Sequence, residues 1–138
     1  MKIGMILDAP YPIDPRVSNE ASALISAGHE VYLFCLSYSK KFIKKEVVNS
    51  INVRRYYCSR LTYKLSALAY TFPFYKMIMS RKINNFLISN NIDKVHIHDI
   101  QIASAVFRAT LKSRPVAVDL HELRPDIMED YQRVNSVV

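Results

Sequence analysis

The chain has 138 residues, of which half are hydrophobic, and a formal net charge of +7. This length suits one globular domain with its own core, and the composition excludes a disordered protein. No run of residues approaches the roughly 18 to 20 apolar positions of a membrane-spanning helix, and the short apolar N-terminus lacks a signal-peptide cleavage site. We therefore expect a cytoplasmic protein, with Cys35 and Cys58 as buried, reduced thiols.

The chain alternates between strand-like and helix-like segments from its start. Residues 2–7 form an apolar run typical of a buried parallel strand. Asp14 and Pro15 are typical of a helix cap and a first helical residue, and Gly28 is typical of the position just after a helix. The later expected elements are strands at 29–36, 51–57, 94–98 and 116–120, and helices at 61–72, 79–90 and 100–109 and after Pro125.

Strands that alternate with helices through short connections indicate a parallel sheet with right-handed crossovers. The predicted fold class is α/β, as a Rossmann-like doubly wound sheet with the strand order 3-2-1-4-5. The chain stops soon after the fifth expected strand. We therefore expect residues 1–138 to be a single domain that ends before its last strands.

Two of the expected strands end abruptly in histidine and carboxylate. The first runs through Asp93-Lys-Val-His-Ile-His-Asp99, and the second through Val116-Ala-Val-Asp-Leu-His-Glu122. Ligands of parallel α/β sheets bind where the carboxyl ends of the strands open into a crevice. These two motifs therefore predict a site for a polar, hydroxyl-rich ligand.

The positive charge is concentrated in one segment that also contains many aromatic residues. Basic side chains with interfacial aromatics, here within residues 40–75, suit contact with an anionic membrane surface, and an ordinary solvated face is the alternative. Nucleic acid is not expected as a partner, because no nucleic-acid-binding motif is present. The basic residues are Lys40, Lys41, Lys44, Lys45, Arg54, Arg55, Arg60 and Lys64, against Glu46 alone.

Three motifs, taken in this order, resemble the N-terminal domain of family 4 glycosyltransferases of the GT-B type. The resemblance implies half of a GT-B fold that holds the acceptor, whereas a second Rossmann domain would hold a nucleotide-sugar. It also implies transfer with retention of configuration, without a required metal or other cofactor. The motifs are Met1-Lys-Ile-Gly-Met-Ile6 through Asp14-Pro-Arg-Val17, Glu20-Ala21 and Ala27-Gly-His-Glu-Val31; Asp93 to Asp99; and Asp119-Leu-His-Glu-Leu-Arg-Pro125.

The resemblance also implies roles for individual residues. His98 matches a histidine beside the transferred sugar, where an imidazole could hydrogen-bond a hydroxyl and hold the reactive pose, so we expect it to be catalytic. His121, Glu122 and Asp99 are expected to bind substrate, and Arg16 could contact a phosphate at the start of the first helix.

Each of these residues also has an ordinary structural interpretation. His98 could pair with a backbone carbonyl, Glu122 could cap the next helix, and Arg16 could pair with Glu20 one turn later. His96 lies deeper on the same strand and is expected to be structural. No metal site is expected, because the histidines lack the HExxH spacing and a third firm ligand.

The expected function is that of a retaining glycosyltransferase domain. It would move a sugar from a nucleotide-sugar to a glycan or lipid-linked acceptor in cell-surface polysaccharide synthesis, at the inner face of the membrane. The alternative is a non-catalytic membrane-binding subunit that recruits a separate donor-binding chain. A general nucleotide-binding module is disfavoured, because no Gly-x-Gly-x-x-Gly follows the first strand.

Overall fold

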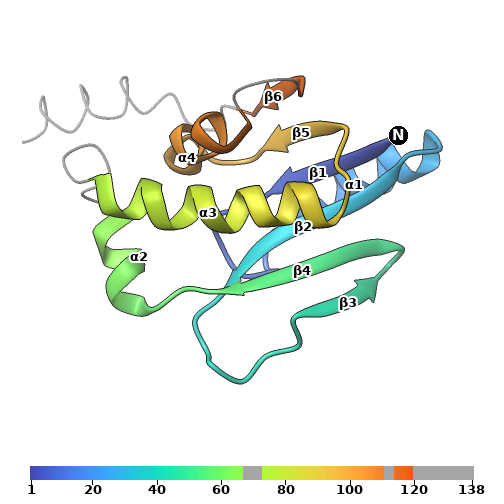
Figure 1. Cartoon of the computed structure of the whole chain (residues 1–138). Coiled ribbons are helices and arrows are strands. Elements are labelled where there is room, and N and C mark those ends of the chain that lie inside the picture. Colours follow the sequence, from blue (N-terminus) through green and yellow to red (C-terminus); the bar gives the residue numbers. More distant parts are fainter. Residues whose placement is uncertain (67–72, 111–113, 120–138) are drawn as a thin grey trace, which may run out of the picture.

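The computed structural model describes residues 1–66, 73–110 and 114–119. A six-stranded sheet in the order β3-β4-β2-β1-β5-β6 forms the centre of the fold, and α3 crosses one of its faces (Figure 1). The elements are β1 (Lys2–Ile6), α1 (Pro15–Ser26), β2 (Glu30–Ser37), β3 (Lys45–Val48), β4 (Ile51–Tyr57), α2 (Arg60–Ser66), α3 (Pro73–Ser89), β5 (Lys94–Ile97), α4 (Ile100–Thr110) and β6 (Val116–Val118).

Five of these strands are parallel and confirm the predicted order 3-2-1-4-5. The sequence did not predict β3, which adds antiparallel to β4 at the edge of the sheet. Asn49 and Ser50, both with positive φ, form the two-residue turn of this hairpin. The signal was weak because β3 has only four residues, two of them charged, and its turn lacks glycine.

The sheet is buried on both faces, as its continuous apolar strands predicted. On one face, the even-numbered residues of β1 and β2, such as Ile6 and Phe34, pack with side chains of α3 and α4. On the other face, Met5 and Leu33 pack with Val17 of α1. The strand-end residues are therefore divided between these two faces.

The ends of α1 follow the predicted signals. The Asp14 side chain accepts the backbone N–H of Arg16, and Pro15 is the first helical residue. At the other end, Gly28 (φ 84°) donates to the Ile25 carbonyl and His29 donates to the Leu24 carbonyl. This pair of bonds is the Schellman motif, and it turns the chain directly into β2.

The structure agrees only in part with the remaining predictions, which concern the later helices, the cysteines and membrane-spanning segments. Helix α3 begins at Pro73 itself rather than near Met79, because proline suits the first helical position. The end of the helix expected at 61–72, and hence the predicted break before Pro73, lies outside the described ranges. Cys35 and Cys58 are both buried and are not bonded to each other. Within the described ranges, no helix is long and apolar enough to cross a membrane. The expected helix after Pro125 lies outside those ranges.

Gly4 allows the central strand to lie against the connection into β5. A Cβ atom at position 4 would lie 2.9 Å from Ile92 Cγ2 and 3.1 Å from Phe86 Cε1, both in buried side chains.

We predict that Gly4→Ala lowers the free energy of unfolding by about 1–3 kcal/mol through overpacking, measured by urea denaturation. Gly28→Asn is the control, because nothing lies within 4 Å and asparagine tolerates positive φ. Equal stability of the Gly4→Ala protein and the wild type would contradict this packing.

Candidate functional site

The carboxyl ends of β1, β5 and β6 meet at one edge of the sheet. The backbone N–H of His98 donates to the Ile6 carbonyl (3.1 Å), and that of Asp119 donates to the Ile97 carbonyl (2.8 Å). These bonds continue the parallel pairing one residue beyond the strands. Asp8, His98 and Asp119 consequently all follow neighbouring strands at this edge, which is where the sequence predicted a site.

His98 lies on the face of the sheet that α1 covers, together with His96 and Glu20. The rings of His96 and His98 have centroids 4.5 Å apart. Oε2 of Glu20 lies 3.5 Å from Nδ1 of His98 and 3.7 Å from Nδ1 of His96. From the sequence, Glu20 was expected only as part of the family motif and as a partner of Arg16, although its place in α1 beside buried Val17 and Ala21 could have indicated that it faces the sheet.

His98 is only 4% exposed. Burial and the neighbouring His96 lower the pKa of His98 to about 4, even though the Glu20 carboxylate lies nearby. The imidazole is therefore neutral at pH 7. Its Nε2 atom is buried and has no hydrogen-bond partner in the described part of the chain. A buried polar atom without a partner is uncommon in proteins and often marks a ligand site.

Arg16 and Asp14 form a bidentate pair at the start of α1. Nη2 and Nε of Arg16 donate to the two Asp14 oxygens at 2.7 and 3.1 Å. The hydrogen bond to Asp14 raises the pKa of Arg16, and the charges of Asp119 and Asp99 raise it further, so these carboxylates are near. The structure thus gathers the predicted residues Arg16, His98 and Asp99, and it pairs Arg16 with Asp14 rather than with Glu20.

Two of the predicted substrate-binding residues cannot be placed. His121 and Glu122 lie outside the described residues. Their expected position in the acceptor crevice remains a prediction.

Asp8 occupies the opposite face of the sheet and was not predicted as a site residue. The Tyr75 hydroxyl donates a short hydrogen bond to Oδ1 of Asp8, whereas the buried Oδ2 has no such partner among the residues described. Burial raises the pKa of Asp8 to about 7; the Tyr75 bond opposes this rise, and the charge of Asp99 adds to it. Its place directly after an apolar strand was the signal that could have identified it.

Glu20, His96 and His98 could together hold a divalent metal ion, because one donor atom of each lies within 4.8 Å of the others. Histidine that binds a metal usually donates its second ring N–H to a partner, which fixes the ring. Nε2 of His98 lacks such a partner in residues 1–66, 73–110 and 114–119. The arrangement therefore fits a histidine pair beside a carboxylate better than a metal centre.

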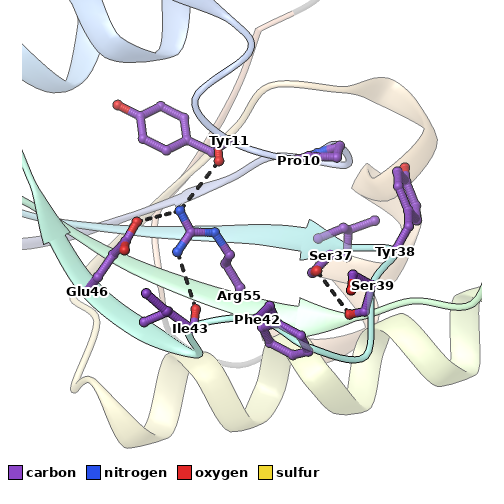
Figure 2. Close-up of a pocket in the computed structure, with 10 residues that line it drawn as sticks. Pro10, Tyr11, Ser37, Tyr38, Ser39, Phe42, Ile43, Glu46 and Arg55 are labelled. Atoms are coloured by element: carbon purple, nitrogen blue, oxygen red, sulfur yellow. Dashed lines mark hydrogen bonds and ion pairs between the residues drawn. The ribbon is translucent and has the colours of Figure 1, made fainter.

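A pocket of about 430 Å³ opens where β2 ends, between the segment that follows β1 and the segment that precedes β3. Figure 2 shows Arg55 at its base, where Nη2 bonds Glu46 at 2.6 Å and the guanidinium also reaches the carbonyls of Tyr11 and Ile43. Its walls are mainly apolar, with the rings of Tyr38 and Phe42. This size and lining are typical of small-molecule sites.

Only some residues of the basic segment at 40–75 are exposed on the surface. Arg55 is paired with Glu46, and Arg54 bonds Asn90 and lies over the Tyr32 ring. Several of its aromatics are in the core: Tyr75 is buried, and Tyr56 stacks on Phe34. The exposed part includes Lys40, Lys41, Lys44 and Lys45 with Ile43 and Val47, and also Arg60 and Lys64 with Leu61 and Tyr63 in α2.

The opposite pKa shifts of Asp8 and His98 predict opposite effects on stability. Between about pH 4.5 and 6, Asp8 takes up a proton on folding and His98 releases one. Their contributions to the pH dependence of the free energy of unfolding therefore cancel in the wild type. Asp8→Asn should therefore make the free energy of unfolding rise with pH by about 1 kcal/mol per pH unit relative to wild type.

His98→Asn should make the free energy of unfolding fall with pH by a similar amount, because only the Asp8 contribution remains. Urea denaturation at several pH values measures both slopes. Slopes of the same sign in the two variants would contradict the assignment.

Comparisons with known proteins identify the family and similar folds. The model of Glycosyltransferase Family 4 matches residues 16–136, which is most of the chain. A search of curated proteins finds no match. A sucrose-phosphate synthase from Thermosynechococcus elongatus has a similar structure, with a TM-score of 0.68 and 13% identity over 89% of this chain and 33% of its own.

Two further solved structures are similar. An Escherichia coli protein described as trehalose-6-phosphate bound with UDP-2-fluoro glucose gives a TM-score of 0.61 and 11% identity, over 86% of this chain and 32% of its own. A trehalose-6-phosphate synthase, studied for glycosyl transfer with retention, gives a TM-score of 0.57 and 12% identity, over 86% of this chain and 31% of its own. The chain spans about a third of the length of these structures. With a family match over most of its length, the chain belongs to glycosyltransferase family 4 and corresponds to the N-terminal domain of a GT-B glycosyltransferase.

Proposed function

We propose that the chain is the acceptor-side half of a retaining glycosyltransferase. The enzyme would move a sugar from a nucleotide-sugar to a glycan or lipid-linked acceptor in cell-surface polysaccharide synthesis, without a metal cofactor. The observation that carries this proposal is His98, a buried neutral imidazole at the carboxyl edge whose Nε2 has no hydrogen-bond partner among the described residues. The similar structures bound to a UDP-sugar derivative, or studied for transfer with retention, support the donor and the stereochemistry.

The strand-end residues divide the work of holding substrates. His98 hydrogen-bonds a sugar hydroxyl and so helps to hold the anomeric carbon in reach of the acceptor. Arg16 is paired with Asp14 at 2.7 Å, but its side chain is 49% exposed, against 14% for Arg55, and it lies at a helix N-terminus whose backbone N–H groups favour an anion, so a phosphate can still reach it. Asp99 lies two residues after the end of β5, next to His98, and its carboxylate can accept hydrogen bonds from further hydroxyls.

We assign part of the acceptor to the pocket of Figure 2. Its aromatic walls, Tyr38 and Phe42, offer flat apolar surfaces to the C–H face of a sugar ring or to the start of a lipid chain. The Arg55 guanidinium is already neutralised by Glu46 at 2.6 Å. The pocket therefore favours a neutral part of the acceptor, such as a sugar ring, over a phosphate group.

The exposed basic segment supports an acceptor that lies in a membrane. Four lysines surround Ile43 and Val47, whose side chains are 63% and 68% exposed. Each lysine near an anionic lipid surface contributes about 1 kcal/mol, and exposed apolar side chains can enter the interface. This surface would bring the carboxyl edge to the inner face of the membrane. It equally suits the alternative, a non-catalytic subunit that recruits a donor-binding chain.

His98→Ala tests the catalytic assignment. With the donor-binding half of the enzyme present, we expect sugar transfer to fall on the order of 100-fold, because the sugar loses a contact that orients it. Release of the nucleoside diphosphate in the presence of acceptor measures the rate. Asn19→Ala, an exposed change on α1, is the matched control. Wild-type turnover in the His98→Ala enzyme would contradict the proposal.

Lys40→Glu/Lys41→Glu tests the membrane surface. We expect this variant to bind vesicles that contain anionic phosphatidylserine at least about tenfold more weakly, because two attractive charges become repulsive. Vesicle sedimentation at low and high salt measures the affinity. Lys94→Glu, at an exposed position on β5, is the control. Vesicle binding that persists without any sugar transfer would favour the non-catalytic subunit.

A further inference from the structure

We propose that Glu20 is a positioning residue that sets the tautomer of His98. Its carboxylate accepts the Nδ1–H of His98, which leaves Nε2 unprotonated as the atom that accepts a hydrogen bond from a substrate hydroxyl. This inference rests on the proposed function for the identity of the substrate. The tautomer itself is a property of the protein without any ligand.

The backbone places the three side chains together. His96 and His98 are two residues apart at the end of β5, so both rings point to the same face of the sheet. Helix α1 covers that face through Val17 and Ala21. Glu20 lies between these two buried positions in the sequence, and its carboxylate reaches both rings.

The unsatisfied atoms indicate where the protons lie. Oε2 of Glu20 is buried and has no hydrogen-bond partner among the described residues, although Nδ1 of His98 is 3.5 Å away. A buried carboxylate oxygen without a donor is costly, and Nδ1 of His98 lies nearer to it than Nδ1 of His96, so a side-chain adjustment that aligns the Nδ1–H of His98 with Oε2 would supply the donor. That bond requires the proton of His98 to be on Nδ1.

The state of Nε2 follows from that bond. A neutral imidazole has one N–H donor and one acceptor nitrogen, and the hydrogen bond that one nitrogen makes determines the state of the other. With the proton on Nδ1, Nε2 of His98 can only accept. The site then selects a hydroxyl donor, such as that of a sugar, over a phosphate or carbonyl oxygen.

The competing explanation is a metal ion bound by Glu20, His96 and His98. A metal on Nδ1 would put the proton of His98 on Nε2 and reverse the polarity of the site. The tautomer therefore separates the two explanations directly.

Long-range ¹H–¹⁵N NMR correlations on the ¹⁵N-labelled chain at pH 7 test the proposal. We expect His98 to show a protonated Nδ1 and an unprotonated Nε2, unchanged when EDTA is added. Glu20→Gln should keep this pattern because its amide oxygen can still accept, whereas Glu20→Ala should lose it. Asn19→Ala, the neighbouring exposed position, should leave it unchanged.

Three outcomes would overturn the proposal: a protonated Nε2 in the wild type, an unchanged tautomer in folded Glu20→Ala, or a spectrum that EDTA converts to another form. The first is decided by the wild type alone, so it does not depend on whether Glu20→Ala folds. Because no substrate is present, the tautomer can be confirmed even where the proposed sugar transfer fails. In the transfer assay, kcat should fall on the order of tenfold in Glu20→Ala and recover in Glu20→Gln.

Discussion

The parallel pairing of β1 with its two neighbours is the constraint on which the rest of this structure depends. Both faces of β1 are buried, and its register with β2 and β5 determines which residues emerge together at the carboxyl edge. The side chains of Phe86 and Ile92 can pack closely against β1 because position 4 has no side chain. A shift of one residue in this register would exchange the two faces and separate His98 from Glu20.

The site is organised by burial more than by net charge. Desolvation shifts the pKa values of two titratable groups at adjacent strand ends, Asp8 and His98, toward their neutral forms, on opposite faces of the sheet. Neutral groups that keep an unused hydrogen-bonding atom suit the recognition of hydroxyls. The lysines lie apart from them, in the segment from Lys40 to Lys45. The proposed membrane contact and the proposed contact of His98 with a sugar hydroxyl thus involve different segments, whereas Phe42 and Ile43 of the lysine segment also line the pocket of Figure 2.

Residue patterns were most informative where local signals and topology agree. His98, Arg16 and Asp99 could be placed at one edge because each follows a predicted strand or begins a predicted helix. The contacts of Glu20 could not be predicted, since helical periodicity does not show which strand residue a helix faces. Arg55 was assigned to a surface patch for a similar reason: composition records a charge but not the carboxylate or carbonyls that surround it.

The sequence by itself determined the order of the strands, the ends of α1, the family resemblance and the edge of the sheet at which the polar strand-end residues gather. These follow from the period of apolar residues, from capping residues and from the rule that parallel strands point the same way. Only the tertiary structure decided that Glu20 joins the two histidines, that Tyr75 bonds Asp8, and that a pocket forms around Tyr38 and Arg55. These contacts join residues distant in the chain, and their geometry depends on how helices and loops pack on the sheet.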